Sequence, residues 1–214
     1  FIRQRGTIQG TAVRKLPAIK RRAALLLKRP RIIPRIAKNY MSLMMGGKPL
    51  RIVDIAIDYR CPLKCKFCAT VRYEKDCECM TAGQFRAAID QAIGCGALGI
   101  CFMGGEPTAS NILPDLISHA SQKNAITSVV TNGVFTDMEY LRRLRGCGLD
   151  ILMLSIHEGV DESFSMGGDS SLGVQTVRYG EILGNAKKAG LEVALMVYMD
   201  HQTLSSGHTQ MMAD

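Results

Sequence analysis

The sequence predicts an α/β fold in which a parallel sheet curls into a full or partial barrel. Two observations lead to this prediction. Apolar, β-rich runs alternate with helical patterns from residue 51 onward, and such alternation builds βαβ units with right-handed crossovers. Most of the runs also pair an aliphatic face with a face that carries polar groups, which suits a sheet covered by helices on one side and lining a lumen on the other.

The expected strands and helices follow one another at regular intervals. Strands are expected at about 51–58, 98–103, 126–131, 149–156 and 191–198, and helices at about 81–94, 111–122, 137–145 and 174–189. Two helix starts carry the capping-box pattern, in which a side chain and a backbone satisfy each other's donors: Thr81 with Gln84, and Thr136 with Glu139. Five strands are visible, and the sequence stops where a further helix and a sixth strand would follow.

Charge divides the chain into two parts. Residues 1–51 hold fourteen Lys and Arg residues and no acidic residue, whereas residues 52–214 hold thirteen basic and nineteen acidic residues. We therefore expect a basic, proline-interrupted helical extension over residues 1–50 and the barrel over 51–214, with the C-terminal part of the barrel missing from the sequence. The extension fits three alternatives, in this order of preference: packing against the barrel, contact with a membrane surface, or contact with nucleic acid.

The sequence shows no sign of export. No uninterrupted apolar run approaches the roughly 18–20 residues that cross a bilayer, and no signal-peptide pattern stands at the start. We expect a cytoplasmic protein, with membrane association through the basic extension as an open alternative. The eight cysteines are then thiols or metal ligands and not disulfide partners.

Three cysteines stand close together in the stretch DYRCPLKCKFCAT, residues 58–70, directly after the first expected strand. A structural zinc ion takes four protein ligands. The three thiols of Cys61, Cys65 and Cys68 instead suit a [4Fe–4S] cluster whose fourth iron has no protein ligand. Cys77 or Cys79 could supply a fourth ligand, in which case the protein would be a non-catalytic iron–sulfur electron carrier or a zinc-binding module.

Further motifs follow the later strands. Gly104, Gly105, Glu106 and Pro107 form a GGEP stretch after the second strand, TNG occupies residues 131–133, and LSIHEG occupies residues 154–159. Together with the three cysteines, this series resembles the motifs of radical S-adenosylmethionine (radical SAM) enzymes over about residues 50–200. The resemblance implies a partial (β/α)6-type TIM barrel, truncated after the fifth strand, in the branch of the family that carries GGEP and TNG.

The resemblance also implies a reaction and its cofactors. A [4Fe–4S] cluster would bind S-adenosylmethionine (SAM) through its open iron, and a flavodoxin- or ferredoxin-type donor would supply an electron. Reductive cleavage of SAM would give methionine and a 5′-deoxyadenosyl radical, which takes a hydrogen atom from the substrate. The motifs serve SAM and leave the substrate open between a peptide, a small molecule and a lipid-like molecule.

The resemblance assigns SAM-binding roles along the same rim of the barrel. Phe67 would lie near the adenine, residues 104–107 would offer a backbone oxygen to the SAM amino group, and Asn132 and Ser155 would bind the polar part of SAM. Where the family often has Asp, this sequence has His157. That histidine could bind the ribose, contact the substrate or relay a proton, or it could be purely structural.

Overall fold

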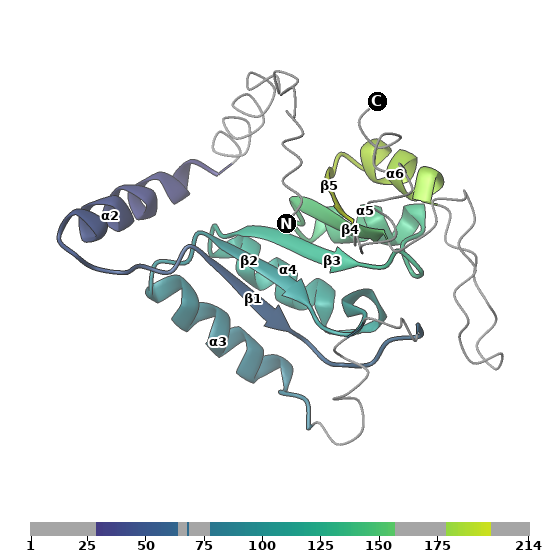
Figure 1. The fold of residues 1–214 in the computed structure, drawn as a ribbon, viewed down its shortest axis with the longest axis horizontal. Coiled ribbons are helices and arrows are strands. Elements are labelled where there is room, and N and C mark those ends of the chain that lie inside the picture. Colours follow the sequence, from purple (N-terminus) through teal and green to yellow (C-terminus); the bar gives the residue numbers. More distant parts are fainter. Residues whose placement is uncertain (1–28, 64–67, 69–77, 157–178, 198–214) are drawn as a thin grey trace, which may run out of the picture.

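The computed structural model describes residues 29–63, 68, 78–156 and 179–197. These residues form one parallel sheet with its helices packed beside it (Figure 1). The strands are β1 (Ile52–Ala56), β2 (Gly99–Met103), β3 (Ile126–Thr131), β4 (Ile151–Ile156) and β5 (Glu192–Val197). The helices of the barrel are α3 (Ala82–Gly94), α4 (Leu113–Gln122), α5 (Met138–Gly146) and α6 (Tyr179–Lys188). The predicted α/β fold with a parallel sheet is confirmed.

The strands lie in the sheet in the order in which they occur in the sequence, β1 to β5, and every neighbouring pair is parallel. A helix separates each strand from the next, and neighbouring helices pack on one another: α3 on α4, α4 on α5, and α5 on α6. All carboxyl ends of the strands therefore meet at one edge of the sheet. This edge is where the sequence motifs were expected to converge.

One face of the sheet packs against the helices and forms the core. The alternate residues that point to this face include Phe102, Val129 and Leu152, which have no exposed surface. On the opposite face Ser128 and Met153 are only partly buried. Burial on one face and partial exposure on the other confirm the expected division between a helix-covered side and a lumen side.

Two predicted helix starts have different outcomes. The capping box that begins with Thr81 is confirmed by reciprocal hydrogen bonds. The box predicted for Thr136 and Glu139 is wrong, because α5 starts after Asp137, whose side chain accepts the backbone N–H three residues later. The Thr136 hydroxyl instead donates to the carbonyl of Gly133. Asp and Thr both cap well, and because the Thr136 hydroxyl is used in this local turn, Asp137 caps the helix.

The described part of the basic extension contains a 3-10 turn, η1 (Pro30–Ile32), and helix α2 (Ile33–Met44). A proline, Pro34, lies at the start of α2. It stands in the first turn, where the missing N–H of proline costs no hydrogen bond. In Figure 1, α2 lies beyond the edge of the sheet at which the strands begin.

No helix within the described ranges is both long enough and apolar enough to span a membrane.

Candidate functional site

The segment that leads from β1 to Cys61 is held against the loop that follows β2. Three backbone hydrogen bonds continue the pairing of the two strands beyond their ends. They run from Ile57 N to Met103 O (3.0 Å), from Gly105 N to Asp58 O (2.8 Å) and from Glu106 N to Arg60 O (2.8 Å). The backbone of the GGEP stretch therefore fixes the chain immediately before the first cysteine of the motif.

Gly104 and Gly105 allow this contact because they lack side chains. A Cβ atom at Gly104 would lie 2.2 Å from the carbonyl oxygen of Asp58, and one at Gly105 would lie 2.2 Å from that of Arg60. Gly104 also has a φ of +139°, which side-chain-bearing residues rarely adopt. The predicted approach of SAM to these glycines stays a prediction, and the observed close approach is between two loops of the protein.

Asp58 shapes the turn that precedes Cys61. Its buried carboxylate accepts the backbone N–H of Arg60 at 3.0 Å and the guanidinium of the same residue at 2.9 Å. The ion pair with Asp58 raises the pKa of Arg60 above its ordinary value. Because the Arg60 side chain is largely exposed, this pair organises the local turn more than it stabilises the fold.

Glu106 links the GGEP stretch to the TNG stretch. Its side chain is 1% exposed and accepts hydrogen bonds from the backbone and hydroxyl of Thr108, from the Thr131 hydroxyl at 2.7 Å and from the Asn132 backbone N–H at 2.8 Å. Within the described ranges Glu106 forms no salt bridge. Burial raises the pKa of Glu106 above its ordinary value, although the hydrogen bonds that it accepts oppose this rise.

Asn132 connects TNG to the cysteine loop. Its side-chain N–H donates to Cys61 Sγ at 3.6 Å, and its side-chain oxygen accepts the backbone N–H of Val134 at 2.9 Å. The backbone N–H of Leu63 also donates to Cys61 Sγ, at 3.4 Å. Two N–H donors are directed at this sulfur, and such donors tune the cysteine ligands of iron–sulfur clusters. Cys61 and its surroundings therefore fit a cluster ligand.

The remaining predicted site residues divide into two groups. Cys68 is half-buried, Pro107 is buried at the start of η3 (Pro107–Ala109), and Ser155 lies half-buried on the lumen side of β4. Four residues that the sequence singled out lie outside the described residues: Cys65, Phe67, Cys77 and His157.

The hydrogen-bonding role of the threonines was not expected from the sequence. Thr131 belongs to TNG and Thr108 follows GGEP directly, but neither was expected to be a hydrogen-bond partner of Glu106. The sequence did contain a signal for the Thr131 contact. Glu106 follows β2 and Thr131 ends β3, and the ends of neighbouring parallel strands lie side by side. The SAM-binding roles of Glu106, Asn132 and Ser155 stay predictions.

Comparison with known proteins adds independent support. The model of the Radical SAM superfamily matches residues 55–209. The matched curated relatives include the PqqA peptide cyclases of Granulibacter bethesdensis, 27% identical over 152 residues, and of Bradyrhizobium diazoefficiens, 32% identical over 120 residues. These alignments cover 70% and 56% of this chain but only 40% and 31% of the relatives. The chain therefore spans less than half the length of these relatives.

Solved structures share the fold at lower sequence identity. BtrN in complex with AdoMet and 2-DOIA superposes with a TM-score of 0.53 at 19% identity, covering 71% of this chain and 58% of BtrN. Streptococcus suis SuiB bound to S-adenosylmethionine also gives 0.53, at 16% identity, covering 94% of this chain and 43% of SuiB. These likenesses confirm the partial-barrel fold.

The family match is to the superfamily as a whole, so membership of the branch that carries GGEP and TNG stays a prediction. Residues 55–209, which the family model matches, begin within β1 and include all four motifs. The chain belongs to the radical SAM superfamily.

Proposed function

We propose that this chain carries the cluster- and SAM-binding part of a radical SAM enzyme. The observation that carries the proposal is the joining of three motifs at one edge of the sheet. GGEP pairs with the segment before Cys61, Glu106 accepts from TNG, and Asn132 donates to Cys61 Sγ. A non-catalytic electron carrier or a zinc-binding module needs the first cysteine but not this arrangement, and the family match disfavours both.

The chemistry supplied by a bound [4Fe–4S] cluster and SAM is one-electron cleavage of SAM to methionine and a 5′-deoxyadenosyl radical, which takes hydrogen from the substrate. Cys61, Cys65 and Cys68 would hold the cluster. The 104–107 backbone would bind the SAM amino group. Glu106 would keep the GGEP and TNG loops in register, so that the cofactor meets a rigid rim. A flavodoxin- or ferredoxin-type protein would supply the electron.

We propose a peptide as the substrate. The curated relatives at 27% and 32% identity are peptide cyclases. The lumen side also offers an apolar layer below the motifs, where Val130 pairs with Met153 and Met153 pairs with Ala194. Methionine side chains adapt to irregular apolar groups, so this layer suits an apolar side chain of a bound peptide.

The proposal is tested by anaerobic reconstitution with iron and sulfide. We expect about four irons and four sulfides per chain, and formation of 5′-deoxyadenosine when SAM and dithionite are added. Cys61→Ala should abolish both. Cys95→Ala is the matched control, because Cys95 is exposed at the far edge of the sheet, beside α2, and it should retain both.

Metal analysis separates the alternatives. One zinc per chain without labile sulfide, lost on Cys79→Ala, would instead establish the zinc-binding module. A cluster that forms normally but produces no 5′-deoxyadenosine with dithionite would establish the electron carrier. Substrate class is then addressed by following hydrogen transfer from deuterated candidate peptides into 5′-deoxyadenosine.

A further inference from the structure

Helix α2 has its polar side towards the protein and its apolar side towards the outside. Asn39 is the buried residue of this helix, whereas Tyr40 is 65%, Met41 62% and Met44 70% exposed. A surface helix of a globular protein normally has the opposite arrangement. The exposed apolar residues of α2 and its end, here called the outward face, are Ile33, Tyr40, Met41, Leu43, Met44 and Met45.

Hydrogen bonds from the polar side hold α2 in this orientation. Asn39 donates to the carbonyl of Gly96 at 2.7 Å. Arg35 donates to the carbonyls of Ala97 and Lys123 at 3.1 and 2.9 Å. Turning the helix to bury its outward face would break these bonds and leave main-chain carbonyls without partners. The outward face is therefore a fixed feature of the fold.

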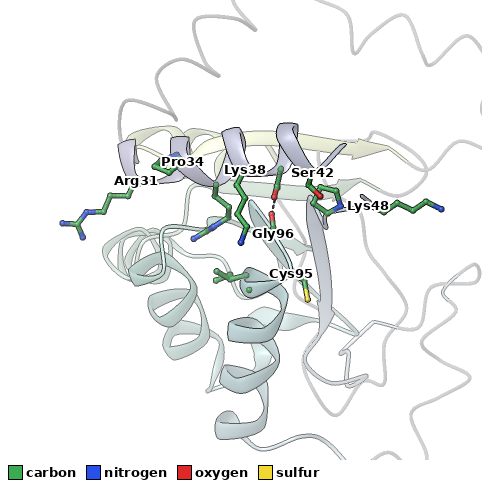
Figure 2. Close-up of a pocket in the computed structure, with 12 residues that line it drawn as sticks. Arg31, Pro34, Lys38, Ser42, Lys48, Cys95 and Gly96 are labelled. Atoms are coloured by element: carbon green, nitrogen blue, oxygen red, sulfur yellow. Dashed lines mark hydrogen bonds between the residues drawn. The ribbon is translucent and has the colours of Figure 1, made fainter. Parts of the chain in front are cut away.

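Cations lie along the polar side of this helix. A groove of about 700 Å³ between α2 and the end of α3 is lined by Arg31, Arg35, Lys38 and Lys48 (Figure 2). Arg31, Lys38 and Lys48 are exposed. The whole of residues 1–51 contains no acidic residue. An apolar helix face beside a dense positive charge is the pattern of helices that lie in the plane of an anionic membrane surface.

We propose that the outward face of α2 docks on the surface of an anionic phospholipid bilayer. Tyr40, Met41 and Met44 enter the boundary between head groups and acyl chains, and Arg31, Lys38 and Lys48 contact lipid phosphates. A second copy of the chain is a poor occupant, because a two-fold interface would bring two positive, acid-free segments together. This inference does not rest on the proposed radical chemistry, since docking needs neither cluster nor SAM.

The experiment measures co-sedimentation of the intact protein with vesicles, without SAM. We expect binding to phosphatidylglycerol vesicles that weakens with salt, and much weaker binding to phosphatidylcholine vesicles. The triple variant Tyr40→Gln, Met41→Gln, Met44→Gln retains every charge and good helix propensity. It should bind phosphatidylglycerol vesicles at least about 20-fold more weakly, because it loses the apolar contact.

A second pair of variants tests the charges with a matched control. Removing three cations beside α2 (Arg31→Gln, Lys38→Gln, Lys48→Gln) should weaken binding at least about 10-fold. Removing three exposed cations of α5 and α6 (Arg142→Gln, Arg143→Gln, Lys187→Gln) changes the net charge equally and should weaken it less than about 2-fold.

Three results would overturn the proposal. The first is the absence of wild-type binding to phosphatidylglycerol vesicles. The second is vesicle binding by the Gln variant of Tyr40, Met41 and Met44 as tight as that of the wild type, which would assign binding to charge alone. The third is a wild-type dimer in sedimentation velocity that this variant converts to a monomer while vesicle binding is unchanged, which would make a second copy the occupant.

Discussion

Each edge of the sheet holds a buried ionisable side chain that joins neighbouring loops, Glu106 at the carboxyl edge and Arg29 at the amino edge, and the two are satisfied differently. Among the described residues, the donors to Glu106 at the carboxyl edge are all neutral groups. At the amino edge the guanidinium of Arg29, which is 8% exposed, pairs with Asp150 at 2.9 Å and donates to Ser121 and Gly148. The charge of Arg29 is therefore balanced by Asp150, whereas Glu106 relies on neutral donors.

This difference indicates what each edge is built for. An ion pair with further hydrogen bonds holds Arg29 against the loops that carry Ser121 and Gly148, which suits an edge that anchors the basic extension. A buried carboxyl with a raised pKa is sensitive to its surroundings, which suits an edge where we expect charged ligands to bind. The following substitutions test the comparison, from the largest expected effect to the smallest.

Removing the carboxylate should have the largest effect on stability. Glu106→Ala leaves the hydroxyl of Thr131, the backbone N–H of Asn132 and both donors of Thr108 without their buried acceptor. We expect a loss of about 4 kcal/mol in the free energy of unfolding, measured by urea denaturation. The control Glu139→Ala removes an exposed glutamate and should cost less than about 0.5 kcal/mol. Equal effects of the two variants would contradict the role given to Glu106.

Breaking the ion pair at the amino edge should cost somewhat less. Arg29→Met keeps an apolar stem but leaves Asp150 buried without its cation, at a cost of about 3 kcal/mol. A double-mutant cycle with Asp150→Asn should give a coupling energy above about 1 kcal/mol. Arg142→Met, at an exposed position, is the control. A coupling energy near zero would show that Arg29 acts through its carbonyl contacts alone.

A methyl group added at the loop contact should cost about 2 kcal/mol. Gly105→Ala places a Cβ 2.2 Å from the carbonyl oxygen of Arg60, so the segment before Cys61 must move. We also expect fewer irons per chain after reconstitution. Gly184→Ala in α6 meets no atom within 4 Å and should be neutral or stabilise by up to about 1 kcal/mol. Normal stability and iron content in Gly105→Ala would contradict the close contact.

The smallest expected effect is a pH dependence. Because the pKa of Glu106 is raised in the folded protein, the unfolded chain releases this proton first as the pH rises above the ordinary glutamate pKa. Wild-type stability should therefore fall as the pH rises between the ordinary glutamate pKa and the higher folded pKa. The Glu106→Gln variant has no such loss. The difference in the free energy of unfolding between wild type and this variant, measured by urea denaturation, should therefore shrink as the pH rises. If the stability difference instead grows with pH, the hydrogen bonds that Glu106 accepts lower its pKa by more than burial raises it.

Much of the fold followed from the sequence because local patterns determine it. Strand and helix positions followed from alternation and capping, and the motifs met at one edge because all strands are parallel. The network around Glu106 could not be predicted in the same way. Glu106 and its hydrogen-bond donor Thr131 are 25 residues apart in the sequence. Their pairing depends on the register of β2 and β3.

The orientation of α2 was also beyond the sequence. Periodicity identifies an apolar and a polar side of a helix but not which of them meets the protein. Here the contacts of Arg35 and Asn39 with carbonyls at the amino edge decide it. These acceptors lie in loops some 60 to 90 residues away in sequence, so only the folded sheet brings them within reach.

The strand order has a consequence for how the protein is made. The strands lie in the sheet in the order in which the ribosome delivers them, and Cys61 emerges roughly 40 residues before Gly104 and 70 before Asn132. At common synthesis rates this is a delay of roughly 2 to 14 s. During that time the thiols have neither the glycine platform nor the amide donor that fix them in the finished fold. We therefore expect metal to be inserted after β3 has docked, and newly made chains to be the state most vulnerable to oxidation.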